Sequence, residues 1–161
     1  MFDSIKKKET LIIDNINYSQ IKQSPIHGYG LFATQDILKN SILGTLDGQL
    51  ISWNNYEVLK KELFKLCKLT KNCYDYFFIE WNALSKESLL VRAFRTKYSF
   101  INHSIYPNLK IIKLGSTKLE IKTCKNIQKG EEFLLNYRDE PLRKEYLMQN
   151  ENSYLLTMNL L

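Results

Sequence analysis

Short stretches in which apolar and polar residues alternate recur along this chain and predict a mainly β protein. The predicted strands cover residues 11–13, 18–23, 29–33, 42–46, 49–51, 76–81, 89–91, 109–113, 119–123 and 132–135. Asp47-Gly48 is a strong signal for a tight hairpin between the fourth and fifth strands, and Gly115-Ser116 predicts another between the eighth and ninth. The first five strands therefore read as a β-meander.

Helical spacing of apolar residues predicts two helices. Ser52 is a good N-cap, and we expect the helix after it to run to about Leu69 and to end by Asn72. Its apolar face consists of Trp53, Tyr56, Leu59, Leu63, Leu66 and Cys67. We expect this face to pack in the core. A C-terminal helix is expected to open at Asp139-Glu140-Pro141 and to run to about Met148, because Pro and acidic residues favour the first helical turn.

Two segments far apart in the chain resemble each other. Residues 36–42 and 126–133 both place an apolar residue and a Lys before Asn40 or Gly130, directly ahead of a predicted strand. Asn and Gly tolerate a left-handed backbone. The resemblance predicts that one type of turn is used twice.

The length and composition are those of one soluble domain. Of 161 residues, 44% are apolar and 25% are charged, which is enough for a core without disulfides. No apolar run reaches the roughly 20 residues that span a bilayer, and residues 1–8 lack the apolar segment of a signal peptide. We therefore expect no membrane partner and a soluble intracellular protein, in the cytoplasm or the nucleus.

The cysteines and the net charge narrow the chemistry further. Cys67, Cys73 and Cys124 form no Cys-x-x-Cys pair and have no His at zinc-ligand spacing, so we expect reduced thiols and no metal site. The net charge of +6 favours acidic partners, but the lysines are dispersed along the chain. A nucleic-acid-binding domain is thus an alternative that rests on charge alone, and we expect no direct nucleic-acid binding.

One polar loop, residues 99–108, follows an apolar lead-in and ends in a Pro-Asn turn signal. It contains His103, one of two histidines, between Asn102 and Ser104. These side chains offer several donors and acceptors, which suits either a loop that grips a polar ligand or a turn bonded within itself. The loop alone does not decide between the two.

Three features in order give the loop a context. They are the His27-Gly28-Tyr29-Gly30 run, the Asn102-His103-Ser104 loop with Pro107-Asn108, and Lys129-Gly130-Glu131-Glu132 followed by Tyr137. From about Ile21 to Tyr137 the chain resembles the SET-domain protein lysine methyltransferases. The order and spacing of the three motifs make this resemblance specific.

The resemblance implies the SET-domain (β-clip) fold, in which several small sheets surround a knot-like crossing of the Asn-His loop and the C-terminal segment. It divides the chain into a leader (1–16), a SET domain (17–140) with a variable insertion helix (52–72), and a C-terminal helical tail (141–161). The tail would pack on the domain or on a dimer partner.

The resemblance also implies an activity. S-adenosylmethionine would donate a methyl group to the side-chain amine of a lysine in a protein or peptide, and a histone is one candidate. Cofactor and lysine would enter from opposite faces and meet in a narrow channel. Tyr137 would be the catalytic residue, with its hydroxyl beside the transferring methyl and the amine.

The cofactor-binding residues implied by the resemblance are Gly28, Tyr29, Gly30, Asn102 and His103. The two glycines would let the backbone at Tyr29 approach the methionine part of the cofactor. Asn102 and His103 would hold the cofactor and tie the crossing together, and for His103 the structural share is expected to be the larger.

Several positions depart from the family pattern. Leu46 stands where a Tyr is common, Ser99 where an Arg is common, and Leu135 where a Phe or Tyr influences how many methyl groups are added. These departures leave open the rate, the degree of methylation, and an alternative in which the chain is an inactive SET-fold module that binds a peptide or protein.

The cysteine-rich segment that follows many SET domains is missing from this sequence. The tail would then cover the adenine of the cofactor, where Tyr146 and Tyr154 could stack or could be ordinary packing residues. The tail also ends in an apolar run, 155–161, that needs burial either against its own domain or in a homodimer.

Overall fold

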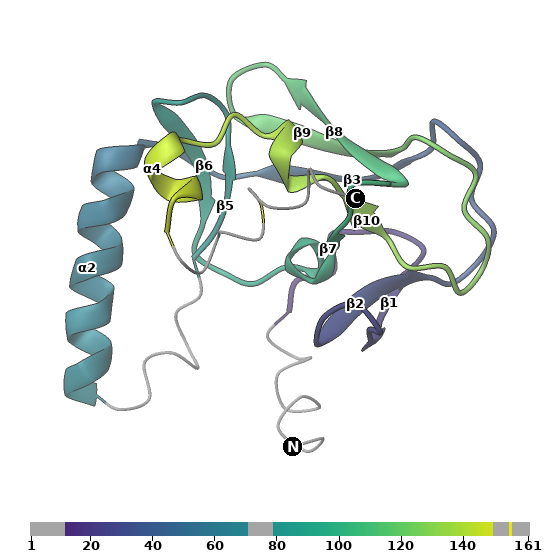
Figure 1. The fold of residues 1–161 in the computed structure, drawn as a ribbon, viewed down its shortest axis with the longest axis horizontal. Coiled ribbons are helices and arrows are strands. Elements are labelled where there is room, and N and C mark those ends of the chain that lie inside the picture. The colour runs from purple at the N-terminus through teal and green to yellow at the C-terminus, as the bar shows by residue number, and fades with distance from the viewer. Residues whose placement is uncertain (1–11, 71–78, 150–154, 156–161) are drawn as a thin grey trace.

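The computed structural model describes residues 12–70, 79–149 and 155, without the side chains of residues 67–70 (Figure 1). Most of the predicted leader, the first part of the predicted strand at 76–81, and most of the predicted tail lie outside the described residues. The same holds for Cys73 and Tyr154 and for the side chain of Cys67.

Within the described residues, ten short strands form four small sheets, which confirms the predicted mainly β fold. The strands are β1 (Ser19–Gln23), β2 (Tyr29–Ala33), β3 (Ile42–Asp47), β4 (Gln49–Ser52), β5 (Glu80–Ala83), β6 (Ser88–Arg92), β7 (Asn102–His103), β8 (Leu109–Leu114), β9 (Lys118–Thr123) and β10 (Leu134–Leu135). The sheets have the orders β1-β2, β3-β9-β8, β4-β6-β5 and β7-β10. The β7-β10 pair is parallel and brings the Asn-His loop beside the C-terminal segment.

The hairpin predicted at Asp47-Gly48 is wrong, and with it the meander beyond β2. Asp47 pairs with Lys118 of β9, whereas Gln49 pairs with Val91 of β6, so β3 and β4 belong to different sheets. A Cβ on Gly48 would lie 2.6 Å from the Val91 carbonyl oxygen. Gly48 therefore lets the chain pass closely over β6 from one sheet to the next, where a tight turn would send it back. The other predicted hairpin, between β8 and β9, is confirmed.

Helix α2 (Trp53–Thr70) begins where the sequence predicts, because the Ser52 hydroxyl accepts a hydrogen bond from the Asn55 N–H at 3.1 Å. It stands at one side of the sheets (Figure 1). Trp53 and Tyr56 are buried, as expected of an apolar face, but Leu59 is 41% exposed. The predicted packing thus holds in the first turns and weakens along the helix.

The C-terminal helix is shorter than predicted. Residues 137–139 form a 3-10 helix, η2 (Tyr137–Asp139), and the α-helix α4 (Lys144–Leu147) begins only three residues after Pro141. Between them Glu140 is extended, with φ −79° and ψ 144°. The reason is tertiary: the Glu140 carboxylate accepts a hydrogen bond from the backbone of β5, which holds this segment away from a helical path.

The two similar turns pair with each other. Asn40 and Gly130 both have a left-handed backbone, with φ of 69° and 89°, as predicted. The Lys39 N–H donates to Asn126 Oδ1, and the Lys129 N–H donates to Asp36 Oδ1, each at 2.8 Å. An antiparallel bridge between Ile37 and Ile127 completes this reciprocal contact, which we call the paired turns.

The main core lies between the small sheets. Its buried residues include Ile16, Leu31, Leu43, Leu46, Leu90, Ile101, Ile121, Phe133 and Leu135. Ile16 is only 1% exposed, so the chain already contributes to the core at that position. A second cluster joins α2 to the β4-β6-β5 sheet. In the part of the chain that the structure describes, no helix is long and apolar enough to span a membrane.

Candidate active site

The three sequence motifs meet at the carboxylate of Glu132. Asn102 Nδ2 donates to Glu132 Oε1 at 2.7 Å, and the Ser24 hydroxyl donates to Oε2 at 3.0 Å. A Cβ on Gly30 would lie 2.1 Å from Oε1. The glycine run, the Asn-His loop and the 129–132 motif are therefore packed against one another at a point where a side chain in place of Gly30 would displace the Glu132 carboxylate.

The side chain of Asn102 also contacts the backbone of the glycine run. Its Nδ2 lies 3.3 Å from the carbonyl oxygens of His27 and Tyr29, on either side of Gly28. Gly28 has a left-handed backbone with φ +50°. The structure thus brings together four of the predicted cofactor-binding residues, and His27 takes part only through its backbone.

His103 connects the crossing to Tyr137. Its Nδ1 accepts a hydrogen bond from the Tyr137 N–H at 3.1 Å, and the two rings lie 5.2 Å apart. Burial lowers the pKa of His103 below its usual value of 6.5. A neutral imidazole is what this contact needs, because only the deprotonated Nδ1 can accept the hydrogen bond.

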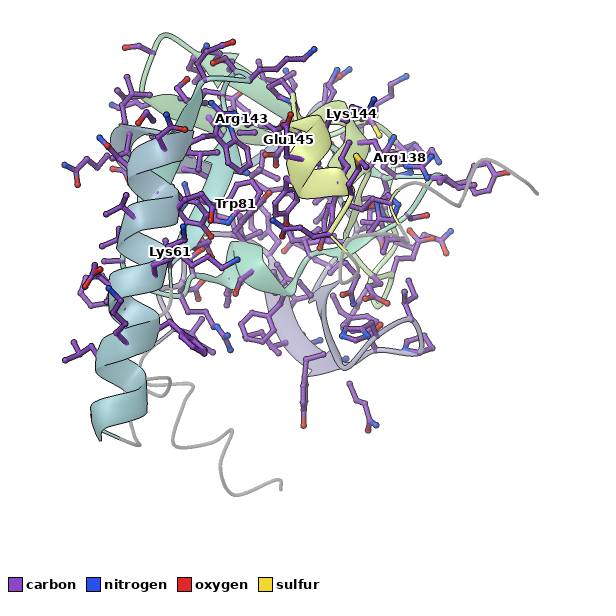
Figure 2. The ribbon with its side chains drawn as sticks, turned by 60° about the vertical axis from the view of Figure 1, so that its left-hand side comes forward. Lys61, Trp81, Arg138, Arg143, Lys144 and Glu145 are labelled. Carbon is purple, nitrogen blue, oxygen red and sulfur yellow. The ribbon has the colours of Figure 1, made fainter. Side chains whose placement is uncertain are left out.

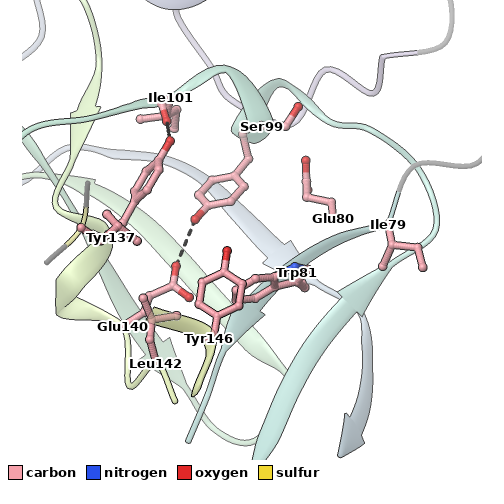
Figure 3. A pocket seen from close by; sticks show the side chains of 11 residues that line it. Ile79, Glu80, Trp81, Ser99, Ile101, Tyr137, Glu140, Leu142 and Tyr146 are labelled. Atoms are coloured by element: carbon pink, nitrogen blue, oxygen red, sulfur yellow. Dashed lines mark hydrogen bonds between the residues drawn. The ribbon is translucent and has the colours of Figure 1, made fainter. Parts of the chain in front are cut away.

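Tyr137 lies at the start of η2 and lines a cavity of about 210 Å³ (Figure 3). Its hydroxyl donates to the Ile101 carbonyl oxygen at 2.5 Å, so the ring is fixed from both ends. The cavity is lined by Ile79, Glu80, Trp81, Tyr98, Ser99, Ile101, Tyr137, Glu140, Leu142, Tyr146 and Leu155. We call it the Tyr137 cavity.

The aromatic wall of the Tyr137 cavity is built on α2. The rings of Trp81 and Tyr146 lie 5.1 Å apart, and Trp53 of α2 contacts both at 5.3 and 5.7 Å. Figure 2 shows Trp81 between α2 and the C-terminal segment that carries Arg143. The Arg143 guanidinium lies 5.5 Å above the Trp53 ring and so fastens that segment to the helix.

Two carboxylates face the same cavity from β5 and from the residue after η2. Glu80 pairs with Arg92 Nε at 2.7 Å. Glu140 Oε1 accepts hydrogen bonds from Asn82 Nδ2 at 2.9 Å and from the Tyr98 hydroxyl at 3.2 Å. Burial raises the pKa of Glu140, and it raises the pKa of Tyr98 well above its usual value, with the Glu140 charge as the next cause.

The three residues that depart from the family pattern lie either in the main core or at the Tyr137 cavity. Leu46 and Leu135 are 1% and 4% exposed and belong to the main core. Ser99 lines the Tyr137 cavity, and its hydroxyl donates to the Thr96 carbonyl oxygen at 3.0 Å. The polar groups of the cavity therefore come from residues other than the two leucines.

Sequence reasoning missed Glu132, Ser24, Tyr98 and Glu140. Glu132 belongs to the Lys129-Gly130-Glu131-Glu132 motif, but the sequence does not indicate which of the two neighbouring glutamates would be a site residue. The partners Ser24 and Glu132 are 108 residues apart, a separation at which no local pattern indicates contact. Of the predicted tail, Tyr146 does lie in the cavity wall.

Comparison with known proteins agrees with this geometry. The family model for the SET domain matches residues 28–138. A histone-lysine N-methyltransferase of Debaryomyces hansenii, named as specific for lysine 36 of histone H3, is 30% identical over 119 residues. The match covers 71% of this chain but only 15% of that relative, so the similarity extends to a small part of the larger protein.

Proposed function

This chain belongs to the SET-domain protein lysine methyltransferase family, and we propose that it transfers a methyl group from S-adenosylmethionine to a lysine side chain. The observation that carries the proposal is the position of Tyr137. His103 holds its backbone N–H and Ile101 holds its hydroxyl, at the wall of a cavity that Ile101, the residue before Asn102, also lines.

The residues at the crossing fit the cofactor. A Cβ on Gly28 would meet no atom within 4 Å, so the backbone before Tyr29 faces open space, and Asn102 Nδ2 lies 3.3 Å from the Tyr29 carbonyl oxygen. We propose that these residues, with His103, hold S-adenosylmethionine, which supplies an activated methyl group when bound. The protein then has mainly to position the acceptor, which is the role we propose for the Tyr137 hydroxyl.

The acceptor amine must lose its proton before it can attack. Lysine has a pKa of about 10.4, so about one amine in a thousand is neutral near pH 7.4. The Tyr137 cavity offers aromatic walls from Trp81, Tyr98 and Tyr146. Burial between them, close to a positive sulfonium, would favour the neutral amine.

A lysine in a protein or peptide is the proposed substrate, and histone H3 is the first to test because the relative's name specifies it. The experiment is transfer of labelled methyl to core histones, ribosomal proteins and the protein itself. Tyr137→Phe should lower turnover roughly 100-fold or more while cofactor affinity changes little. Tyr106→Phe is the matched control, because Tyr106 is 73% exposed. Normal turnover of Tyr137→Phe would refute the role of Tyr137.

A second candidate function is a SET-fold module that binds a peptide without catalysis. Leu46 and Leu135 favour it, because both are buried core residues without the hydroxyl that relatives often carry there. Calorimetry with S-adenosylmethionine separates the two. Micromolar binding supports the enzyme, and no binding supports the module.

A further inference from the structure

We propose that the Glu140 carboxylate is an anionic subsite for an organic cation in the Tyr137 cavity. The proposal rests on the methyltransferase function proposed above. Under that function two organic cations reach this cavity: the alkylammonium group of the acceptor lysine and the sulfonium of S-adenosylmethionine. Both carry one positive charge on an aliphatic chain, and the test below distinguishes them.

The two carboxylates of the cavity differ in the groups that they contact. Glu80 has a counter-charge, because its Oε2 lies 2.7 Å from Arg92 Nε. Glu140 has hydrogen bonds from neutral donors: Asn82 Nδ2, the Tyr98 hydroxyl, and the Ala83 N–H at 2.6 Å. No ion pair within residues 12–70 and 79–149 includes Glu140.

The Arg92 charge acts on Glu140, but the hydrogen bonds of Arg92 go to other groups. Its Nε donates to Glu80, its second nitrogen to Asn82 Oδ1 at 2.6 Å, and its third to the Asp47 carbonyl oxygen at 3.2 Å. No N–H group in this set of contacts is directed at Glu140. Glu140 is half-buried, and a charge withdrawn from water is normally paired, so the absence of an ion pair to Glu140 among the described residues points to a ligand.

The surroundings suit an organic cation rather than a metal ion. Tyr137, Trp81 and Tyr146 supply aromatic faces and edges around the carboxylate (Figure 3), and the ring of Tyr98 lies beside it through the hydroxyl hydrogen bond. Aromatic faces attract organic cations, and they offer few of the oxygen ligands that a hard metal ion requires.

The Glu140 carboxylate can also accept a further hydrogen bond. An ionised carboxylate can accept about four hydrogen bonds, and Glu140 receives three from the protein. These three fix its orientation at the cavity wall. One acceptor position remains for a ligand N–H, or for contact with a sulfonium.

The experiment compares cationic ligands with neutral ligands of similar size by calorimetry. One pair is S-adenosylmethionine and S-adenosylhomocysteine. The other is a histone H3 peptide centred on the lysine that the relative's name specifies, and the same peptide with norleucine in place of that lysine. In the unmodified protein at least one pair should favour the cation about tenfold. Glu140→Gln should abolish that preference, and Glu120→Gln, in β9, should leave it unchanged.

The pair that responds identifies the cation. If the unmodified protein transfers methyl but neither pair shows a preference, or if folded Glu140→Gln keeps it, the subsite is refuted and the proposed function stands. Glu140→Asp, which withdraws the charge by one methylene group, decides the question if Glu140→Gln does not fold; retention of the full preference would refute the subsite.

A protein that binds neither cofactor nor peptide would contradict the proposed function instead. The subsite is then tested with n-butylammonium against 1-butanol, followed by tryptophan fluorescence, because Trp81 lines the cavity. A response to the cation that Glu140→Gln lacks supports the subsite, and equal responses refute it.

Discussion

Glu132 joins three segments of the chain at one carboxylate, and Gly30 is the residue that gives it room. In Gly30→Ala, the new Cβ would lie 2.1 Å from Glu132 Oε1 and would push the carboxylate away from Asn102. We expect a loss of about 1–3 kcal/mol in the free energy of unfolding, together with weaker binding of S-adenosylmethionine. Urea denaturation and calorimetry measure the two effects.

The control is to make Gly30→Ala a second time in a protein that already carries Glu132→Ala. In Glu132→Ala the obstructing carboxylate is gone, so adding Gly30→Ala should cost much less than it does in the unmodified protein. An equal cost in both backgrounds would show that the contact with Glu132 is not the cause.

His103 gives the fold a dependence on pH. Its pKa is lower in the folded protein than in the unfolded chain, so the unfolded chain binds the proton more readily. The stability contributed by neutral His103 is fully present above about pH 6.5 and is lost as the pH falls through the folded-state pKa. Urea denaturation at pH 7.5 and pH 5.5 should show this loss, and His103→Gln should reduce it. The same pH dependence in both proteins would contradict the assignment.

At the residue scale, the sequence predicted which motif residues lie close together, but it did not predict the hydrogen bonds that join them. Gly28, Gly30 and Asn102 do lie together, because motif order reflects the fold of the family. The carboxylates of Glu132 and Glu140 were not predicted as site residues. Their partners lie 30 and 58 residues away in sequence, and only the folded chain brings them into contact.

At the scale of elements, α2 supports the cavity from behind. Trp53 is 2% exposed and contacts both Trp81 and Tyr146, so Trp53→Ala should cost about 3–5 kcal/mol and should loosen the aromatic wall. Val58 on the same helix is 60% exposed, and Val58→Ala should change stability by no more than about 0.5 kcal/mol. Thermal unfolding of both variants checks this, and similar losses in the two would contradict it.

The helices and strands were predicted well where the local sequence pattern determines them. They were predicted poorly where pairing with distant segments determines them. The Ser52 cap, β2 and the β8-β9 hairpin follow from local sequence. Asp47-Gly48 has the composition of a hairpin turn, but pairing with β9 and β6 outweighs it. The start of the C-terminal helix was misplaced for the same reason, since a contact with β5 keeps Glu140 extended.

At the scale of the whole molecule, the predicted homodimer remains a prediction. Leu155 is 4% exposed and lines the Tyr137 cavity, so one residue of the apolar run 155–161 packs on its own domain. If the rest of that run is covered by a second copy, sedimentation velocity should show a species of twice the monomer mass that dissociates on dilution. A monomer at every concentration would refute the dimer.

The paired turns have a consequence for how the protein is made. Two hydrogen bonds between a backbone N–H and a side-chain oxygen join residues 87 and 93 positions apart in these turns, so the first turn has no partner until the second has left the ribosome. At about 5–20 residues per second, this interval lasts roughly 5–20 s. β1 and β2 can pair with each other early, but the nascent chain must keep β3 without its partner β9 for seconds, and the paired turns can close only after Lys129 has been synthesised.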